Sequence, residues 1–279
     1  MHGYAEQRRF SMRKLLHNIF ITVCLLVFAN ISYANDKNKK YEKITEGGRL
    51  YDKWWQEYNL KEPTTTHPAY PASGKQKGST TWRCKECHGW DYRGKNGAYG
   101  KGSHFTGITG IQNYAGKPIN NIVQILKNKN HQYDTVMLNK ALHLIALFVS
   151  EGQVDTAKFV NDSSKKAKGN TKIGKHIFAD KCVRCHGTEG NDINFGDIVE
   201  PEFVGTVASK NPWEAIHKIY NGHPGSVMGP KIMHSNRSIH QRHHMGLIKP
   251  MESMPYMRGE LSAEGIKHLL TYIQTLPVE

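Results

Sequence analysis

Cysteine is scarce in this sequence, and acidic residues are few. The 279 residues include five cysteines, an odd number and too few for a disulfide scaffold in a chain of this length. Lys and Arg number 38 against 24 Asp and Glu, so the formal charge is +14. Hydrophobic residues make up 38%, which excludes a disordered chain and a multi-span membrane protein. The length favours two domains.

The first 34 residues are typical of an export signal. Basic residues at positions 8, 9, 13 and 14 precede an eleven-residue run, 19–29, in which only Thr22 is polar. A membrane anchor is less favoured, because a spanning helix needs about 20 apolar residues. Ser32 and Ala34 are small residues suited to a cleavage site, so we predict cleavage after Ala34 and a periplasmic protein. Cleavage removes Cys24 and leaves 34 basic against 23 acidic residues, a charge of +11.

The remaining four cysteines form two identical motifs. Cys84-Lys85-Glu86-Cys87-His88 and Cys182-Val183-Arg184-Cys185-His186 both read C-x-x-C-H, the attachment signature of c-type haem. Two thiols three positions apart can form thioethers to one porphyrin, and the next residue then offers an imidazole to the iron. A zinc site is disfavoured because the pairs lie 98 residues apart. No βαβ pattern supports a thioredoxin-like dithiol. We predict two covalently bound haem c groups, with His88 and His186 as proximal ligands.

With these motifs, residues 44–279 resemble the class I cytochrome c superfamily in tandem diheme form. The resemblance implies an all-α fold of two cytochrome c-like helical domains, each around one covalently attached haem. We expect a signal peptide at 1–34, a first haem domain at 41–152, a linker at 153–170 and a second haem domain at 171–279. Apolar periodicity and capping residues predict helices over 48–58, 118–127, 139–150, 172–180 and, after Asn211 as its cap, 212–220, and one that begins after Ser262.

The sixth iron ligands are less strongly specified than the proximal ones. The resemblance implies a Met shortly before the C-terminal helix, and Met254 lies seven residues before Leu261, where that helix is expected to start. Met228 is the alternative for this second haem.

In the first half, the closing helix is expected to start at Leu138, the counterpart of Leu261. The residue seven positions before Leu138 is His131. Met137 is the alternative there, and an open site or ligation by His104 or His67 is a further one. With His131 and Met254, the first haem is bis-His with the lower potential and the second is His/Met with the higher potential.

A histidine-rich segment lies just before Met254. His234, His240, His243 and His244 are interleaved with Lys231, Arg237 and Arg242. Clustered imidazoles could bind copper or zinc. The neighbouring cations disfavour this, so we interpret the segment as a solvated basic loop that covers a haem edge or contacts a partner.

These features favour a periplasmic diheme cytochrome c that relays single electrons between redox partners. The expected partners are acidic periplasmic redox proteins or a membrane-bound oxidoreductase, since a basic surface steers acidic partners. Peripheral contact with anionic membranes is a weaker expectation, and nucleic acid is not expected. The alternative is an enzyme: a catalytic diheme cytochrome, similar to thiosulfate dehydrogenases or to peroxidases, acting at the first haem. No motif requires it, so an electron carrier is favoured.

Overall fold

The computed structural model describes residues 35–197, 199–225 and 254–278. Those ranges are helical and contain no β-strand, only three isolated bridges, which agrees with the all-α prediction. The export signal and the histidine-rich segment lie outside the described residues. Within the described ranges, no helix has both the length and the apolar character needed to cross a membrane.

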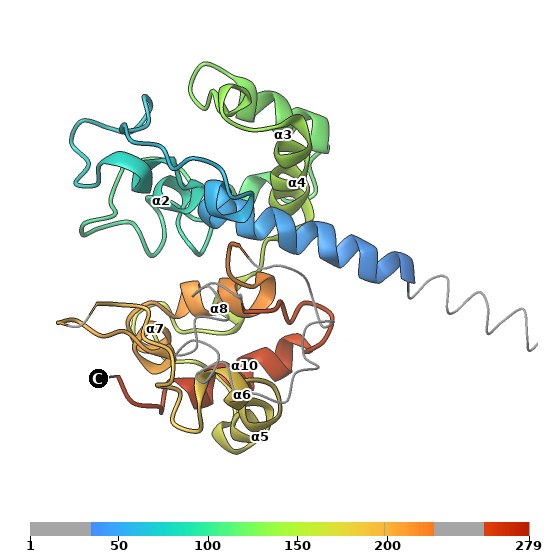
Figure 1. Ribbon diagram of the computed structural model, residues 1–279, viewed down its shortest axis with the longest axis vertical. Coiled ribbons are helices and arrows are strands. Elements are labelled where there is room, and N and C mark those ends of the chain that lie inside the picture. Colours follow the sequence, from blue (N-terminus) through green and yellow to red (C-terminus); the bar gives the residue numbers. More distant parts are fainter. Residues whose placement is uncertain (1–34, 198, 226–253, 279) are drawn as a thin grey trace, which may run out of the picture. The chain divides into compact units, whose positions relative to one another are not determined.

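The N-terminal half is built around a helix that ends at residue 57 (Figure 1). The haem motif forms the short α2, Cys84–His88. Two longer helices follow, α3 (Ile119–Lys127) and α4 (Asn139–Leu147), and α4 continues into one π-helical turn, Phe148–Gly152. The positions of α3 and α4 agree with the predicted helices, whereas the first helix is already formed at residue 35, well before the predicted start at 48. The buried core residues of this half are aromatic and aliphatic: Leu50, Tyr51, Trp54, Leu142, Ile145 and Phe148.

The C-terminal half contains α5 (Thr171–Lys181), α6 (Val183–His186), α7 (Val204–Lys210), α8 (Pro212–Asn221) and α10 (Ala263–Ile273). The side chain of Asn170 caps α5 by accepting hydrogen bonds from the backbone N–H groups of Lys172 and Ile173. Ser262 caps α10 through Gly265, as the sequence predicted. Helix α7 was not predicted.

Both halves cross their first and last helices at a glycine. A Cβ added to Gly47 would lie 2.1 Å from the carbonyl oxygen of Leu144, the sixth residue of α4. A Cβ added to Gly174 of α5 would lie 2.0 Å from the carbonyl oxygen of His268, the sixth residue of α10. Only glycine permits such close backbone contact. In each half, a glycine of an early helix therefore lies against the backbone of the sixth residue of a later helix.

The predicted linker, 153–170, is packed against the rest of the molecule. It contains a 3₁₀ turn, Thr156–Lys158, and a bridge between Val160 and Ala167. Val154, Phe159 and Val160 are buried. The segment therefore makes more contacts than its polar composition suggested, and the domain boundaries on either side of it stay a prediction.

Helix α8 joins the two halves through buried polar contacts. His217 Nε2 donates to the carbonyl oxygen of Gly48 at 2.9 Å, which leaves His217 Nδ1 to accept from the Tyr92 hydroxyl at 3.0 Å. Burial lowers the pKa of His217 to about 3, so its imidazole is neutral. This histidine therefore fixes α8 against the N-terminal half by two hydrogen bonds.

An ion-pair cluster lies beside that contact. The carboxylate of Asp52, with its side chain 1% exposed, pairs with both Arg83 and Lys218. Burial acts to raise the pKa of Asp52, but the charges of Lys218 and Arg83 outweigh it and hold that pKa well below 3.8. Arg83 directly precedes the first haem motif and Lys218 belongs to α8, so one buried carboxylate links the motif to the C-terminal half.

Candidate haem sites

The first haem motif presents two thiols from one helical turn. Cys84 is buried and Cys87 is half-buried, and neither forms a disulfide. Burial raises the pKa of both thiols to about 12, so they are protonated near neutral pH. Paired free thiols on α2 are what thioether attachment to one porphyrin requires.

His88 is held in the tautomer that a metal ligand needs. Its Nδ1 donates to the carbonyl oxygen of Thr109 at 2.8 Å. The carbonyl is fixed by the bridge between Thr109 and Gly94. Burial lowers the pKa of His88, which keeps the ring neutral. The lone pair of Nε2 is therefore available, in the arrangement common to metal-bound histidines.

His131 lies opposite His88. The two ring centres are 6.3 Å apart and the ring planes differ by 22°. An imidazole nitrogen lies about 1.2 Å from its ring centre and a metal–nitrogen bond is about 2.0 Å long, so two imidazoles on one metal have centres about 6.4 Å apart. His131 Nδ1 donates to Asn128 Oδ1 at 3.2 Å. Burial lowers the pKa of His131 to about 4. The pair therefore fits an iron held between two imidazoles.

The other candidates for the first site are engaged elsewhere. Both ring nitrogens of His67 make hydrogen bonds, with the Ala69 N–H and with the His131 carbonyl oxygen. His104 pairs with the buried carboxylate of Glu86 at 2.9 Å. Met137 lies in the hydrophobic core, 7% exposed. Of the four side chains considered from the sequence, His131 is the one whose ring neighbours His88.

The second haem motif sits at the junction of α5 and α6. Cys182 and Cys185 are half-buried free thiols, and burial raises the pKa of Cys182 to about 12. His186 is buried, its pKa is lowered by that burial to about 4, and its ring centre lies 6.1 Å from that of Phe195. Its Nδ1 has no hydrogen-bond partner among the described residues. A neutral, buried imidazole beside two thiols fits the proximal role.

Of the two sulfur candidates for this second haem, one can be placed. Met254 is half-buried and packs on the core of the molecule. Its carbonyl oxygen accepts the backbone N–H of His223 at 3.2 Å, which ties the chain before α10 to the end of α8. Met228, the alternative ligand, lies outside the described residues.

Each haem motif is followed by a glycine whose conformation was not predicted from the sequence. Gly89 and Gly187 adopt φ of 78° and 76°, a region that favours glycine. A Cβ at either position would lie within 2.6 Å of a carboxylate oxygen, of Asp91 and Asp192 respectively. The repeated Cys-His-Gly triplet was the signal for this turn. The hydrogen bonds of His67 and Asn128 to the His131 loop had no comparable signal.

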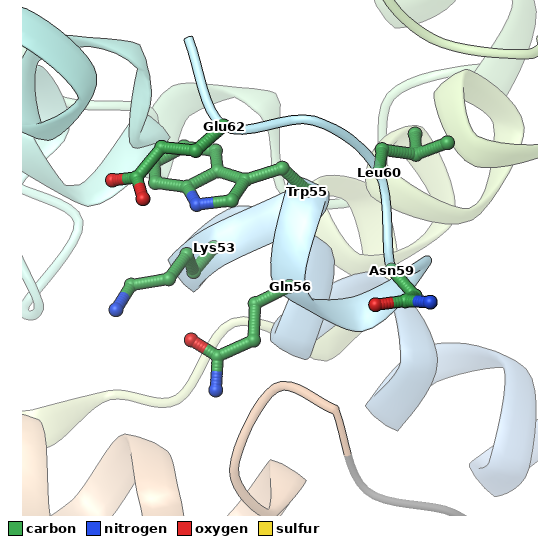
Figure 2. A pocket seen from close by; sticks show the side chains of 6 residues that line it. All are labelled: Lys53, Trp55, Gln56, Asn59, Leu60 and Glu62. Atoms are coloured by element: carbon green, nitrogen blue, oxygen red, sulfur yellow. The ribbon is translucent and has the colours of Figure 1, made fainter. Parts of the chain in front are cut away.

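A pocket of about 230 Å³ lies at the end of the helix that finishes at residue 57 (Figure 2). Its lining consists of Lys53, Trp55, Gln56, Asn59, Leu60 and Glu62. It contains no cysteine or histidine. We therefore do not assign it to haem. The described residues also contain no cluster of three or more His, Cys, Asp or Glu suited to a separate metal ion.

Comparison with known families decides the identity of the C-terminal half. The cytochrome c family model matches residues 171–277. This region is a cytochrome c domain. The matched region contains the close approach of α5 and α10 at Gly174, the motif on α6 and the buried His186. The match supports a c-type cytochrome, a haem-based electron-transfer protein with covalently bound haem c. Neither a curated protein nor a solved structure matches the chain.

Proposed function

We propose that this chain is a periplasmic diheme cytochrome c that relays single electrons between redox partners. The proposal is carried by one observation: the ring centres of His131 and His88 are 6.3 Å apart. His88 belongs to the C-x-x-C-H motif on α2, which lies outside the cytochrome c domain. The glycine crossing of Gly47 with α4, equivalent to that of Gly174 with α10, supports a second cytochrome c-like unit around this motif.

At the first site, Cys84 and Cys87 would attach the haem, and His88 and His131 would ligate its iron. At the second, Cys182 and Cys185 would attach it, with His186 and Met254 as ligands. Haem supplies a one-electron iron couple at each site. A second imidazole lowers the potential and a thioether raises it, so the first site would be the low-potential centre.

The protein's own contribution is to hold these ligands still. Thr109 and Asn128 orient the rings of His88 and His131 by hydrogen bonds to Nδ1. Buried contacts of Asp52 and His217 fix the cytochrome c domain against the first motif. Iron ligands that stay in place when the iron is oxidised or reduced favour electron transfer, because they leave no position on the iron for a substrate. The neutral imidazole of His131, which faces His88, would occupy the sixth position of the first iron. This favours electron relay over catalysis, because catalysis would need that position to be open.

The charge distribution supports a partner of opposite sign. A charge of +11 after cleavage at Ala34 would steer acidic redox proteins or the acidic face of a membrane-bound oxidoreductase. Weak contact with anionic lipid would be secondary. N-terminal sequencing of protein from a periplasmic extract should begin at Asn35; an intact Met1 in the cytoplasmic fraction would contradict export.

Haem analysis and potentiometry test the relay. We expect two haems per chain, two separate potentials, and slow binding of carbon monoxide to the reduced protein. His131→Ala should open the first haem to rapid carbon monoxide binding, whereas Met137→Leu should leave both haem spectra unchanged. One haem per chain, or a wild-type protein that binds carbon monoxide at once and turns over peroxide or thiosulfate, would overturn the proposal.

The second site is tested by the methionine–iron charge-transfer band. Met254→Ala should abolish that band and lower the higher potential, whereas Met228→Ala should retain both. The reverse result would assign the ligand to Met228.

A further inference from the structure

The loop that carries His131 adopts an uncommon backbone conformation. Gln132, the next residue, has φ of 52° and ψ of 27°, in the left-handed region that non-glycine residues seldom adopt. The Gln132 side-chain amide donates to the carbonyl oxygen of Lys129 at 2.8 Å, and Thr135 Oγ1 donates to the Gln132 carbonyl oxygen at 2.7 Å. Such a conformation persists only where surrounding contacts fix it.

Asn128 supplies one set of these contacts. Its Oδ1 accepts the backbone N–H of Asn130 at 2.9 Å and that of His131 at 3.1 Å. The same oxygen accepts His131 Nδ1 at 3.2 Å. The Asn128 amide oxygen therefore contacts both the backbone and the ring of His131, and the ring also has a hydrogen bond to the backbone of Ile125.

His67 supplies the other contact, and its tautomer is determined by its partners. The Ala69 N–H donates to His67 Nδ1 at 3.1 Å, so the hydrogen of the neutral ring is on Nε2. His67 Nε2 then donates to the carbonyl oxygen of His131 at 3.1 Å. The His67 side chain is buried, so water does not compete for these two hydrogen bonds.

His67 is in turn anchored to the segment just before Cys84. Its backbone N–H donates to Thr81 Oγ1 at 2.8 Å, and its ring centre lies 4.4 Å from that of Trp82 in an edge-on contact. Trp82 Nε1 donates to Thr65, on the same loop as His67, at 2.8 Å. The His131 carbonyl is thus connected to the haem-attachment segment through one buried ring.

We infer that His67 and Asn128 are positioning residues that clamp His131 in place as the sixth ligand of the first haem. The inference rests on the proposed ligation by His131. His67 binds no iron in this arrangement; it holds the loop from the backbone side while Asn128 fixes the ring. Loss of either contact would let His131 leave the iron more often, without removing the ligand itself.

The test uses the full-length holoprotein and the rate at which carbon monoxide displaces the distal ligand from the reduced first haem. His131→Ala, which opens that haem, identifies its kinetic phase. His67→Phe keeps the ring packing on Trp82 but removes both hydrogen bonds of the ring, of which only the one to the His131 carbonyl oxygen holds the His131 loop. Losing that one hydrogen bond should accelerate the phase about 3- to 10-fold. His67→Gln retains a donor and an acceptor, and should return the rate to within about twofold of wild type.

Two further variants complete the design. His143→Phe is the matched control, because His143 donates a single hydrogen bond to the Asn139 carbonyl on the exposed face of α4; its rate should equal that of wild type. Asn128→Ala tests the clamp independently if His67→Phe does not yield soluble holoprotein, and should accelerate the same phase. Asn128→Asp, which keeps an acceptor, should not.

The outcomes separate the clamp from the ligand assignment. If His131→Ala leaves the first haem's spectrum unchanged, ligation by His131 fails and the clamp fails with it. If His131→Ala opens the haem but His67→Phe and Asn128→Ala match wild type, the clamp alone is refuted. A lower unfolding temperature in His67→Phe with an unaltered carbon monoxide phase also refutes it, because that is the signature of a purely structural residue.

Discussion

Replacing Asp52 by Asn should destabilise the protein more than any exposed charge change. The substitution keeps the shape of the side chain and one acceptor oxygen but removes the charge that Arg83 and Lys218 share. The side chains of these two cations are only 18% and 15% exposed, so water does little to replace the lost carboxylate.

The magnitude follows from this burial. Removing one member of a buried ion pair costs about 3–5 kcal/mol, because the remaining charge is left uncompensated. Two contacts reduce the cost here. Arg83 Nε still donates to the Asp52 carbonyl oxygen at 2.9 Å, and both cations lie within 6 Å of the Trp90 ring centre. We therefore expect the lower end of the range, a loss of about 3 kcal/mol.

Urea denaturation of the holoprotein at neutral pH measures this loss. Asp155→Asn is the matched control, since Asp155 pairs with Lys158 at 3.7 Å and both side chains are exposed; its effect should be below about 0.5 kcal/mol. Because the folded-state pKa of Asp52 lies well below 3.8, its stabilisation is present above about pH 4 and is lost as the pH falls through that pKa. A loss below about 1 kcal/mol, or one that varies between about pH 5 and 8, would refute the reasoning.

Two other predictions concern the buried histidine and the turn glycines. The unfolded chain protonates His217 near pH 6.5 but the folded protein only near pH 3, so wild-type stability should fall as the pH drops between these values. His217→Gln should be less stable at neutral pH and should have a slope smaller than that of wild type by up to about 1.4 kcal/mol per pH unit, since other buried histidines still contribute; parallel pH profiles would contradict it. Gly89→Ala and Gly187→Ala should each lower haem content at their own motif, because the Cβ meets Asp91 or Asp192; spectra with two full haems in both variants would argue against a required turn.

Much of the helical framework could be predicted from the sequence because its signals are local. Helices α3, α4 and α10 begin within one residue of their predicted starts, and the hydroxyl of Ser262 caps α10 as predicted. Helix α8 begins at Pro212 as expected, although the Asn211 amide donates to the Glu214 carboxylate and does not cap the backbone. Helix α7 was missed because Val204–Lys210 is short and has no polar capping residue before it.

Contacts between distant segments were not predictable from the sequence. His217 joins Gly48 to Tyr92 through its two ring nitrogens, although the three residues lie far apart in the sequence. Trp90 packs with Tyr99 and with Trp213 of the cytochrome c domain. Such pairings depend on how two halves of the chain meet, and neither periodicity nor spacing carries that information.

The shared helix crossing has a consequence for how the two sites came to differ. Gly174 stands 8 residues before Cys182, whereas Gly47 stands 37 residues before Cys84. In both halves the glycine lies against a backbone carbonyl of the later helix. The longer segment after Gly47 contains His67, Thr81 and Trp82, which contact one another and, through His67, the carbonyl oxygen of His131. The eight-residue step from Gly174 to Cys182 is too short to contain a comparable set of side chains, so the first motif has a supporting layer that the second one lacks the length to form.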